Sequence, residues 1–157
     1  MTDAASVAVQ THGSLRHDLS GEPVEIGSGA ARVRLVTGEA MRADAEGLVH
    51  GGFVFSLADH AAMLAINEPT VVLGGADCRF LAPVRVGDVL EAIAERDAID
   101  GKKQGVNVRV VRVPDGAQPA EASDTGEIDD AAADLVFEGD FTCFVPSRHV
   151  LAAREEE

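Results

Sequence analysis

The chain has 157 residues, 46% of them hydrophobic, which is enough to bury one sizeable core. We therefore expect a single domain over residues 1–157, with flexible segments at residues 1–11 and 114–133. The formal charge of −14 argues against nucleic acids and anionic membranes as partners, because both require a basic surface. The lack of an 18-residue apolar run and of a leader pattern predicts a soluble, cytoplasmic protein, with Cys78 and Cys143 as reduced core residues.

The first half of the chain contains one clear strand and one long helix. Residues 12–20 alternate only weakly between apolar and polar side chains, which predicts a short strand or a turn. Residues 30–37 alternate more clearly and predict a strand, and residues 38–47 form a polar loop that holds Asp44. Residues 52–67 contain no proline and are rich in Leu, Ala and Met, which predicts a helix.

After Pro69 the pattern changes to that of strands. Apolar and polar residues alternate in four segments, and an Asp-Gly-Lys turn at residues 100–102 joins two of them into a hairpin. Gly74 and Gly75 interrupt the first segment, which predicts a bulge. The four segments are residues 71–81, 89–99, 105–113 and 134–145. The expected fold class is therefore α+β, with a meander of about four strands after the helix and a curved antiparallel sheet wrapped around that one long central helix.

The predicted helix is apolar on nearly every side, as in a helix enclosed by the rest of its protein. Its apolar residues are Phe53, Val54, Phe55, Leu57, Ala58, Ala61, Ala62, Met63, Leu64, Ala65 and Ile66. Asp59 and His60 stand in the middle of this helix. A carboxylate in such surroundings is costly unless it is paired, hydrogen-bonded or open to a cleft, so Asp59 is either a site residue or the partner of a buried base. His60 points about 100° away from Asp59 around the helix, and we expect a structural or interface role for it.

The start of the helix and Asp59 are suited to two tasks in hydrolysis: stabilising the carbonyl oxygen and supplying or activating the attacking group. Gly51 and Gly52 open the helix, where free backbone N–H groups and the positive end of the helix dipole can hold an oxygen that gains negative charge. Asp59 can attack a carbonyl carbon or take a proton from water. Eight residues separate Gly51 from Asp59, about 12 Å at ~1.5 Å per residue, so one chain cannot place both groups on one carbonyl. We therefore expect a homodimer, in which a twofold axis brings one helix start beside the partner's acid.

Short motifs along the chain are typical of one family. They are His-Gly-Gly at residues 50–52, Ser-Leu-Ala-Asp at residues 56–59, Arg-Phe-Leu-Ala-Pro-Val at residues 79–84 and Gly-Asp at residues 87–88. In order and spacing they resemble the motifs of hotdog-fold acyl-CoA thioesterases, especially those of the phenylacetate-degradation type, over roughly residues 30–112 and 134–145. The resemblance implies a hotdog fold, hydrolysis of an acyl-CoA to a free acid and CoA, sites shared between two chains, and often a homotetramer built from two dimers.

The resemblance also implies roles for residues around the helix. Asp59 is expected to act as nucleophile or general base. His50 is expected either to orient the loop or contact the thioester, or to cap the helix and fix the loop. Many relatives carry Asn or Gln at the position of Asp44, where the amide binds the carbonyl or water, so Asp44 is either protonated beside Asp59 or does other work. Relatives place Ser or Thr one turn after the acid to hold water, whereas this chain has Met63.

An acyl pocket and a phosphate-binding region complete the expected substrate site. Phe53, Phe55, Met63 and Phe80 are expected to line the pocket, and core packing explains each of them equally well. Coenzyme A enters as part of the substrate, and its phosphates require positive charge. Candidates include Arg85, Lys102 and Lys103, and the alternative for each is a solvated surface charge. We expect no cofactor, and the histidines and cysteines show no metal-ligand spacing.

Two alternatives to hydrolysis stay open at this point. One is a non-catalytic hotdog protein that binds acyl-CoA, which Asp44 and Met63 favour because both depart from the pattern of the enzymes. The other is a hydratase or dehydratase, which would pair His and Asp differently. Hydrolysis of an acyl-CoA thioester is the leading interpretation.

The excess of acidic residues predicts a salt-dependent stability. Twenty-seven acidic residues stand against 13 basic ones, of which only Lys102 and Lys103 are lysines, and this balance resembles that of proteins from salt-loving organisms. Because salt screens the repulsion between like charges, we expect the melting temperature to rise between low salt and molar KCl. Thermal melts across a KCl series measure it, and a flat or falling melting temperature contradicts the halophilic interpretation.

Overall fold

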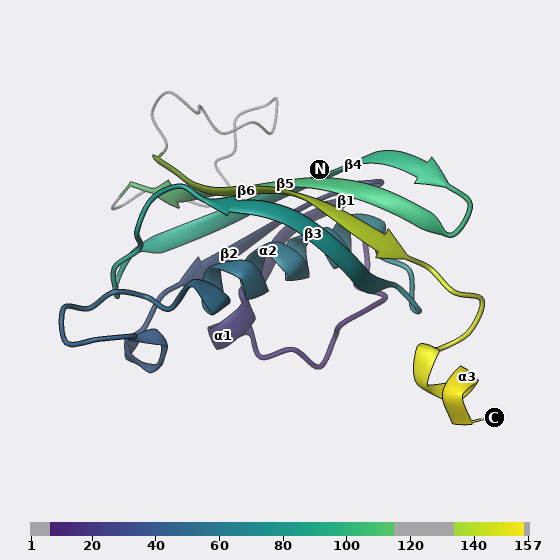
Figure 1. The fold of residues 1–157 in the computed structure, drawn as a ribbon, viewed down its shortest axis with the longest axis horizontal. Helices are drawn as coiled ribbons and strands as arrows, with labels where there is room; N and C mark the ends of the chain where they lie inside the picture. Colours follow the sequence, from purple (N-terminus) through teal and green to yellow (C-terminus); the bar gives the residue numbers. More distant parts are fainter. Residues whose placement is uncertain (1–6, 115–133, 156–157) are drawn as a thin grey trace.

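The computed structural model describes residues 7–114 and 134–155, so the flexibility expected for residues 1–6 and 115–133 lies outside the described residues. A six-stranded antiparallel sheet curves over one long helix, and a short helix lies on the same side of the sheet (Figure 1). The strands are β1 Glu22–Gly27, β2 Ala30–Val36, β3 Val72–Phe80, β4 Val89–Asp100, β5 Lys103–Val113 and β6 Asp134–Phe144. The helices are α1 His17–Ser20, α2 Gly51–Ile66 and α3 Val150–Glu155, with a 3-10 turn, η1, at Glu39–Met41. Within the described ranges, none of the helices combines the length and the apolar character needed to cross a bilayer.

The order of the strands places β3 at one edge of the sheet. The order is β1-β2-β4-β5-β6-β3, which confirms the expected antiparallel sheet around one central helix. The strands after the helix do not form a simple meander, because β3 pairs with β6 instead of β4. The pairing of β3 with β6 shifts register between Leu73 and Gly75, which confirms the predicted bulge. The hairpin of β4 and β5 is also confirmed, with Gly101 in the left-handed conformation that its turn requires (φ 63°).

The region before the central helix differs from the sequence prediction. Residues 12–20 form a turn followed by the short helix α1, so the turn alternative is confirmed and the strand alternative is wrong. The strand β1 was not predicted. Among the residues of β1 only Ile26 is fully buried, so the strand lacks the alternating apolar pattern that would have revealed it. Pro23 can occupy this strand because β1 lies at the sheet edge, where a missing N–H is tolerated.

Asn67 ends the central helix and ties down the segment that precedes the fold. It adopts the left-handed conformation of a helix C-cap (φ 54°), and its N–H donates to the carbonyl of Met63. Its side chain accepts a hydrogen bond from the N–H of Gln10 (2.8 Å) and donates one to the carbonyl of Ala8 (2.9 Å). The described part of the segment that was expected to fray is therefore attached to the end of α2.

The helix α2 is buried along most of its length but leaves one strip partly open. From Leu57 onward every residue of α2 except Asp59 is buried, against a sheet face of Val, Leu and Phe side chains. The open strip consists of Gly52, Phe55, Ser56 and Asp59, which lie three or four residues apart and so share one face of the helix. The only acid of the helix thus lies on its accessible face.

The buried face of α2 carries the stability of the fold. Leu64 is fully buried, so Leu64→Ala is expected to lower the free energy of unfolding by about 2–5 kcal/mol, because it removes packed atoms and leaves a cavity. Leu151, which is 58% exposed in α3, is the matched control, and Leu151→Ala should change stability by less than about 0.5 kcal/mol. Urea unfolding followed by circular dichroism measures both variants, and equal effects would contradict this assignment of the core.

Candidate active site

Asp59 is a partly buried acid without a counter-charge among the described residues. Its Oδ1 atom is buried and has no hydrogen-bond partner in that part of the chain. Removal from water raises the pKa of its carboxyl from 3.8 to about 6, and burial is the only cause of this shift. Glu91 shows the opposite arrangement, because Arg32 Nη2 lies 2.7 Å from its buried Oε1. The alternative for Asp59, one half of a buried ion pair, is therefore not found within the described ranges.

The carboxyl of Asp59 faces the end of strand β6. The rings of Phe55 and Phe141 stack with their centroids 5.5 Å apart, which aligns this part of α2 with β6. Asp59 follows Phe55 by one helical turn, about 6 Å, and Cys143 follows Phe141 by two strand residues, about 6.6 Å. In agreement with this alignment, the charge of Asp59 contributes to raising the pKa of the Cys143 thiol to about 12, after burial as the larger cause. Cys143 is therefore a protonated, buried neighbour of the acid and not a nucleophile.

His50 and two glycines form the start of α2. His50 is the N-cap residue, in an extended conformation (φ −61°, ψ 131°), but its side chain makes no capping hydrogen bond. Its backbone fixes the loop instead, because its N–H donates to the carbonyl of Met41 (2.9 Å). Its carbonyl accepts from the N–H of Phe53 (3.0 Å), which leaves the N–H groups of Gly51 and Gly52 at the helix tip.

Gly52 lies in close contact with the side chain of His50. A Cβ on Gly52 would lie 2.8 Å from Nε2 of His50, so the imidazole folds directly over this glycine. A Cβ on Gly51 would lie 3.5 Å from the ring of Phe80, an ordinary van der Waals contact. The helix tip is thus bordered by the His50 ring on one side and by Phe80, from the edge strand β3, on another.

The other expected pocket residues fall into different environments. Phe80 is 55% exposed and Phe53 is half-buried beside the His50 ring, with 6.0 Å between the ring centroids, so both border the helix start. Met63 is fully buried in the core. Asp44 is exposed, and its Oδ1 accepts hydrogen bonds from the backbone N–H groups of Glu46 (3.0 Å) and Leu48 (3.2 Å). The side chain of Asp44 therefore stabilises the loop that leads to the helix, which is a role other than catalysis.

The basic candidates lie at two ends of the protomer. Arg85 is exposed and forms an isolated β-bridge with Leu48, close to the helix start. Lys102 and Lys103 are exposed at the β4–β5 turn, and Lys103 pairs with Phe144 at the end of β6. The turn therefore lies near the Asp59 end of the sheet. Within one chain, the structure places the arginine and the lysines at opposite ends of α2.

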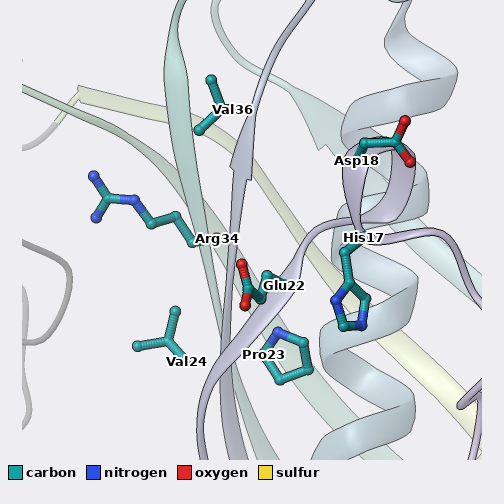
Figure 2. A pocket seen from close by; sticks show the side chains of 7 residues that line it. All are labelled: His17, Asp18, Glu22, Pro23, Val24, Arg34 and Val36. Atoms are coloured by element: carbon teal, nitrogen blue, oxygen red, sulfur yellow. The ribbon is translucent and has the colours of Figure 1, made fainter.

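A hollow of about 640 Å³ lies apart from Asp59, across the opposite edge of the sheet. Its lining comes from α1, β1 and β2, without any residue of α2 (Figure 2). The lining residues are His17, Asp18, Glu22, Pro23, Val24, Arg34 and Val36.

His60, which points about 100° away from the acid around α2, is buried and donates from Nδ1 to the carbonyl of Ser20 (3.0 Å), which is the structural role expected for it. In the described ranges no three His, Cys, Asp or Glu side chains are grouped to hold a metal ion.

Asp59 is expected to make the stability depend on pH. Its folded-state pKa of about 6 exceeds the ordinary value of 3.8, so ionisation disfavours the folded state, with a cost that is absent below pH 4 and complete above pH 6. Asp59→Asn should therefore raise the free energy of unfolding by about 2 kcal/mol at pH 7, after allowance for the partial exposure of the carboxyl, and by almost nothing at pH 4. Urea unfolding at the two pH values measures this difference. Asp77→Asn, at an exposed position on β3, is the matched control, and an equal gain at both pH values would show that the charge of Asp59 is not the cause.

Comparison with known proteins gives relatives of two kinds. An uncharacterized protein of Pyrococcus horikoshii, PH1136, has a solved structure that is 45% identical, with a TM-score of 0.78, over 93% of this chain and 98% of that one. A methylthioribose-1-phosphate isomerase of Aquifex aeolicus is 49% identical over 107 residues, which are 68% of this chain. The chain spans only 24% of the length of that curated relative.

Two further matches concern the fold and the segment around the helix. The PaaI protein of the Escherichia coli phenylacetic acid degradation operon shares the fold, with a TM-score of 0.64 and 20% identity over 83% of each chain. Residues 46–117, which contain the helix start, Asp59 and the strands β3 to β5, match the family described as "Thioesterase superfamily". The helix and sheet described above are the hotdog arrangement, and the matched segment of the chain is similar to the thioesterase superfamily.

Proposed function

We propose that this protein is an acyl-CoA thioesterase, which hydrolyses an acyl-CoA to a free acid and CoA. The observation that carries the proposal is the state of Asp59, an acid on the one open strip of an otherwise buried helix, with no partner for its Oδ1 among the described residues. A raised pKa near 6 leaves this carboxylate mostly ionised at neutral pH and more basic than an ordinary Asp, which suits a general base. An acid with no structural partner at such a position needs a chemical role, because its burial is otherwise a net cost.

The helix start supplies the second half of the chemistry. The N–H groups of Gly51 and Gly52, at the positive end of α2, can donate to the thioester oxygen as it becomes negative during attack. Phe80 and Phe53 offer apolar surface beside these donors for the acyl group. The helix start therefore suits the carbonyl end of a thioester, and Asp59 suits the activation of its attacker.

The two halves meet only if the protein is a dimer. About 12 Å of helix separates Gly51 from Asp59, and a side chain as short as that of Asp cannot bridge it. Every residue of the edge strand β3 is at least partly exposed, although the strand is nine residues long, and an uncovered edge of this length invites pairing. Phe80 ends this edge strand and lies beside Gly51 at the start of α2. A second copy on this surface would cover both and bring its own Asp59 to the first helix start, and a tetramer would then join two such dimers through other surfaces.

In the same proposed dimer, the basic residues expected to bind the CoA phosphates come from both protomers. Arg85 lies near the helix start, whereas Lys102 and Lys103 lie towards the Asp59 end of their own chain. In the proposed dimer these two ends come from different protomers and approach one site. CoA phosphates at the rim of the site would then meet Arg85 of one chain and the lysines of its partner, which offsets the strong negative charge of the whole protein.

A non-catalytic acyl-CoA-binding protein is the second candidate. It is favoured by Asp44 and Met63, because the first is engaged with its own loop and the second is buried in the core. Neither side chain is therefore positioned to bind the thioester carbonyl or a water in the described protomer. The name of the Aquifex relative adds no third candidate, because most of that longer protein lies outside the matched segment.

A mixed dimer of two inactive variants tests the proposal. Asp59→Asn removes the base and is expected to lower the rate of CoA release by about 10²–10⁴-fold. Gly51→Pro removes one N–H donor but suits the first position of a helix, and His50 already has the extended conformation that a following proline requires. In a heterodimer of these variants one of the two sites contains both wild-type halves, so about half of the wild-type activity should return. Thiol release from a panel of acyl-CoAs by separately tagged, co-purified heterodimers measures it.

Matched controls show whether each site is shared between two chains. Gly51→Ala keeps the N–H and adds only a Cβ in ordinary contact with Phe80, so it should remain active. Failure of the heterodimer to recover activity would place both groups within one chain and contradict the shared site. Wild-type protein that binds acyl-CoAs but releases no thiol from any of them would favour the non-catalytic candidate.

A further inference from the structure

Gln104 is a partly buried side-chain amide on β5. Its Oε1 atom is buried, and this atom has no hydrogen-bond partner among the described residues. Side chains alternate along a strand, and Val106, Val108 and Val110, at the same parity, are buried beneath the sheet to 1% exposure or less. Gln104 therefore points to the side of the sheet that faces α2, the side on which Asp59 lies.

The topology brings Gln104 and Asp59 to the same part of the interior. Gln104 pairs with Cys143 across β5 and β6, so their side chains are neighbours on one face of the sheet. After burial as the larger cause, the charge of Asp59 also raises the pKa of the Cys143 thiol. Asp59, on the helix, and Gln104, on the sheet, are therefore both neighbours of Cys143. Both belong to the same chain, so the pair does not depend on a partner for its geometry.

The chemistry of the two groups identifies what fits between them. An ionised carboxylate only accepts hydrogen bonds, and Oε1 of Gln104 is also an acceptor, so the two atoms cannot satisfy each other. Each lacks a donor within the described ranges, which is unfavourable for a buried polar atom. One water molecule has two O–H groups and can donate one to each acceptor, while its lone pair stays free. Two buried acceptors that both lie near Cys143 are thus suited to orient a single water.

We propose that Gln104 is a positioning residue, which holds the attacking water in line with the thioester carbon beside Asp59. This inference rests on the proposed thioesterase function and selects the water-activating mechanism. The water oxygen forms a bond to the carbonyl carbon, and its proton passes to Asp59. The tetrahedral intermediate then expels CoA by breaking the C–S bond, and the thiolate takes the proton from Asp59. Gln104 holds the second O–H throughout and is unchanged at the end.

The first test separates catalysis from stability. Gln104→Leu keeps the size of the side chain but removes the acceptor, so kcat should fall at least tenfold while KM stays within about twofold. The melting temperature should stay constant or rise, because an unsatisfied buried acceptor is replaced by an apolar group. Asn107→Leu is the matched control, since Asn107 lies on the same strand but on the exposed face, where its Nδ2 donates to Asp140 (3.2 Å). It should leave kcat unchanged.

The second test uses readouts that a merely structural residue would not affect. Gln104→Glu places another carboxylate beside Asp59, so the acidic limb of the kcat profile should move to higher pH by about one unit. A single turnover of wild-type enzyme in heavy-oxygen water should label the free acid. An unlabelled acid would show that Asp59 attacks the carbonyl itself, and this result overturns the proposal.

The outcomes also distinguish this inference from the proposed function. If wild-type enzyme hydrolyses acyl-CoA and Gln104→Leu retains its kcat, the role of Gln104 is wrong and the thioesterase function stands. An unshifted pH profile for Gln104→Glu leads to the same conclusion. If wild-type protein hydrolyses none of the acyl-CoAs in the panel, both the function and the inference that rests on it are overturned.

Discussion

The structure depends on the burial of one helix that carries one uncompensated acid. Most of α2 is enclosed by the sheet, and its apolar side chains are the centre of the core. Asp59 interrupts this pattern and receives neither a cation nor a hydrogen bond to its Oδ1 within the described residues. The cost of this arrangement is offset by the packing of the rest of the helix, because each fully buried large apolar side chain contributes about 1.5–3 kcal/mol. The fold can therefore tolerate an acid that does not stabilise it.

Glu91 shows that the same fold can neutralise a buried acid where it serves stability. Its carboxylate lies on β4 with Arg32 Nη2 at 2.7 Å, and its side chain is almost completely buried. Glu91 thus has a cationic partner, whereas Asp59 has none among the described residues, and burial raises the pKa of Asp59 to about 6. The contrast between the two acids is the clearest physical sign of which one is available for chemistry.

Strong periodicity made the central features predictable from sequence. The helix, the strands that follow it and the bulge at Leu73 and Gly75 were found because apolar spacing and glycines mark them directly. The edge strand β1 was missed because a strand with one fully buried residue has no such pattern. The pairing of β3 with β6 was missed because spacing along the chain contains no information about which strands are neighbours. For the same reason, Gln104 and Cys143 could not be placed near Asp59 until the register of β5 and β6 was known.

The separation of Gly51 and Asp59 along α2 also determines how the proposed activity is linked to assembly. A helix is rigid over two turns, so the distance from the Gly51 tip to Asp59 cannot be shortened by motion within one protomer. The open strip of α2 and the exposed edge β3 therefore serve two purposes on the proposed function, since they are both the dimer contact and the wall of the site. In the proposed dimer, the free energy that holds two protomers together would also hold the acid beside the oxyanion donors. Catalysis and association would then depend on one surface, and selection for either one would act on both.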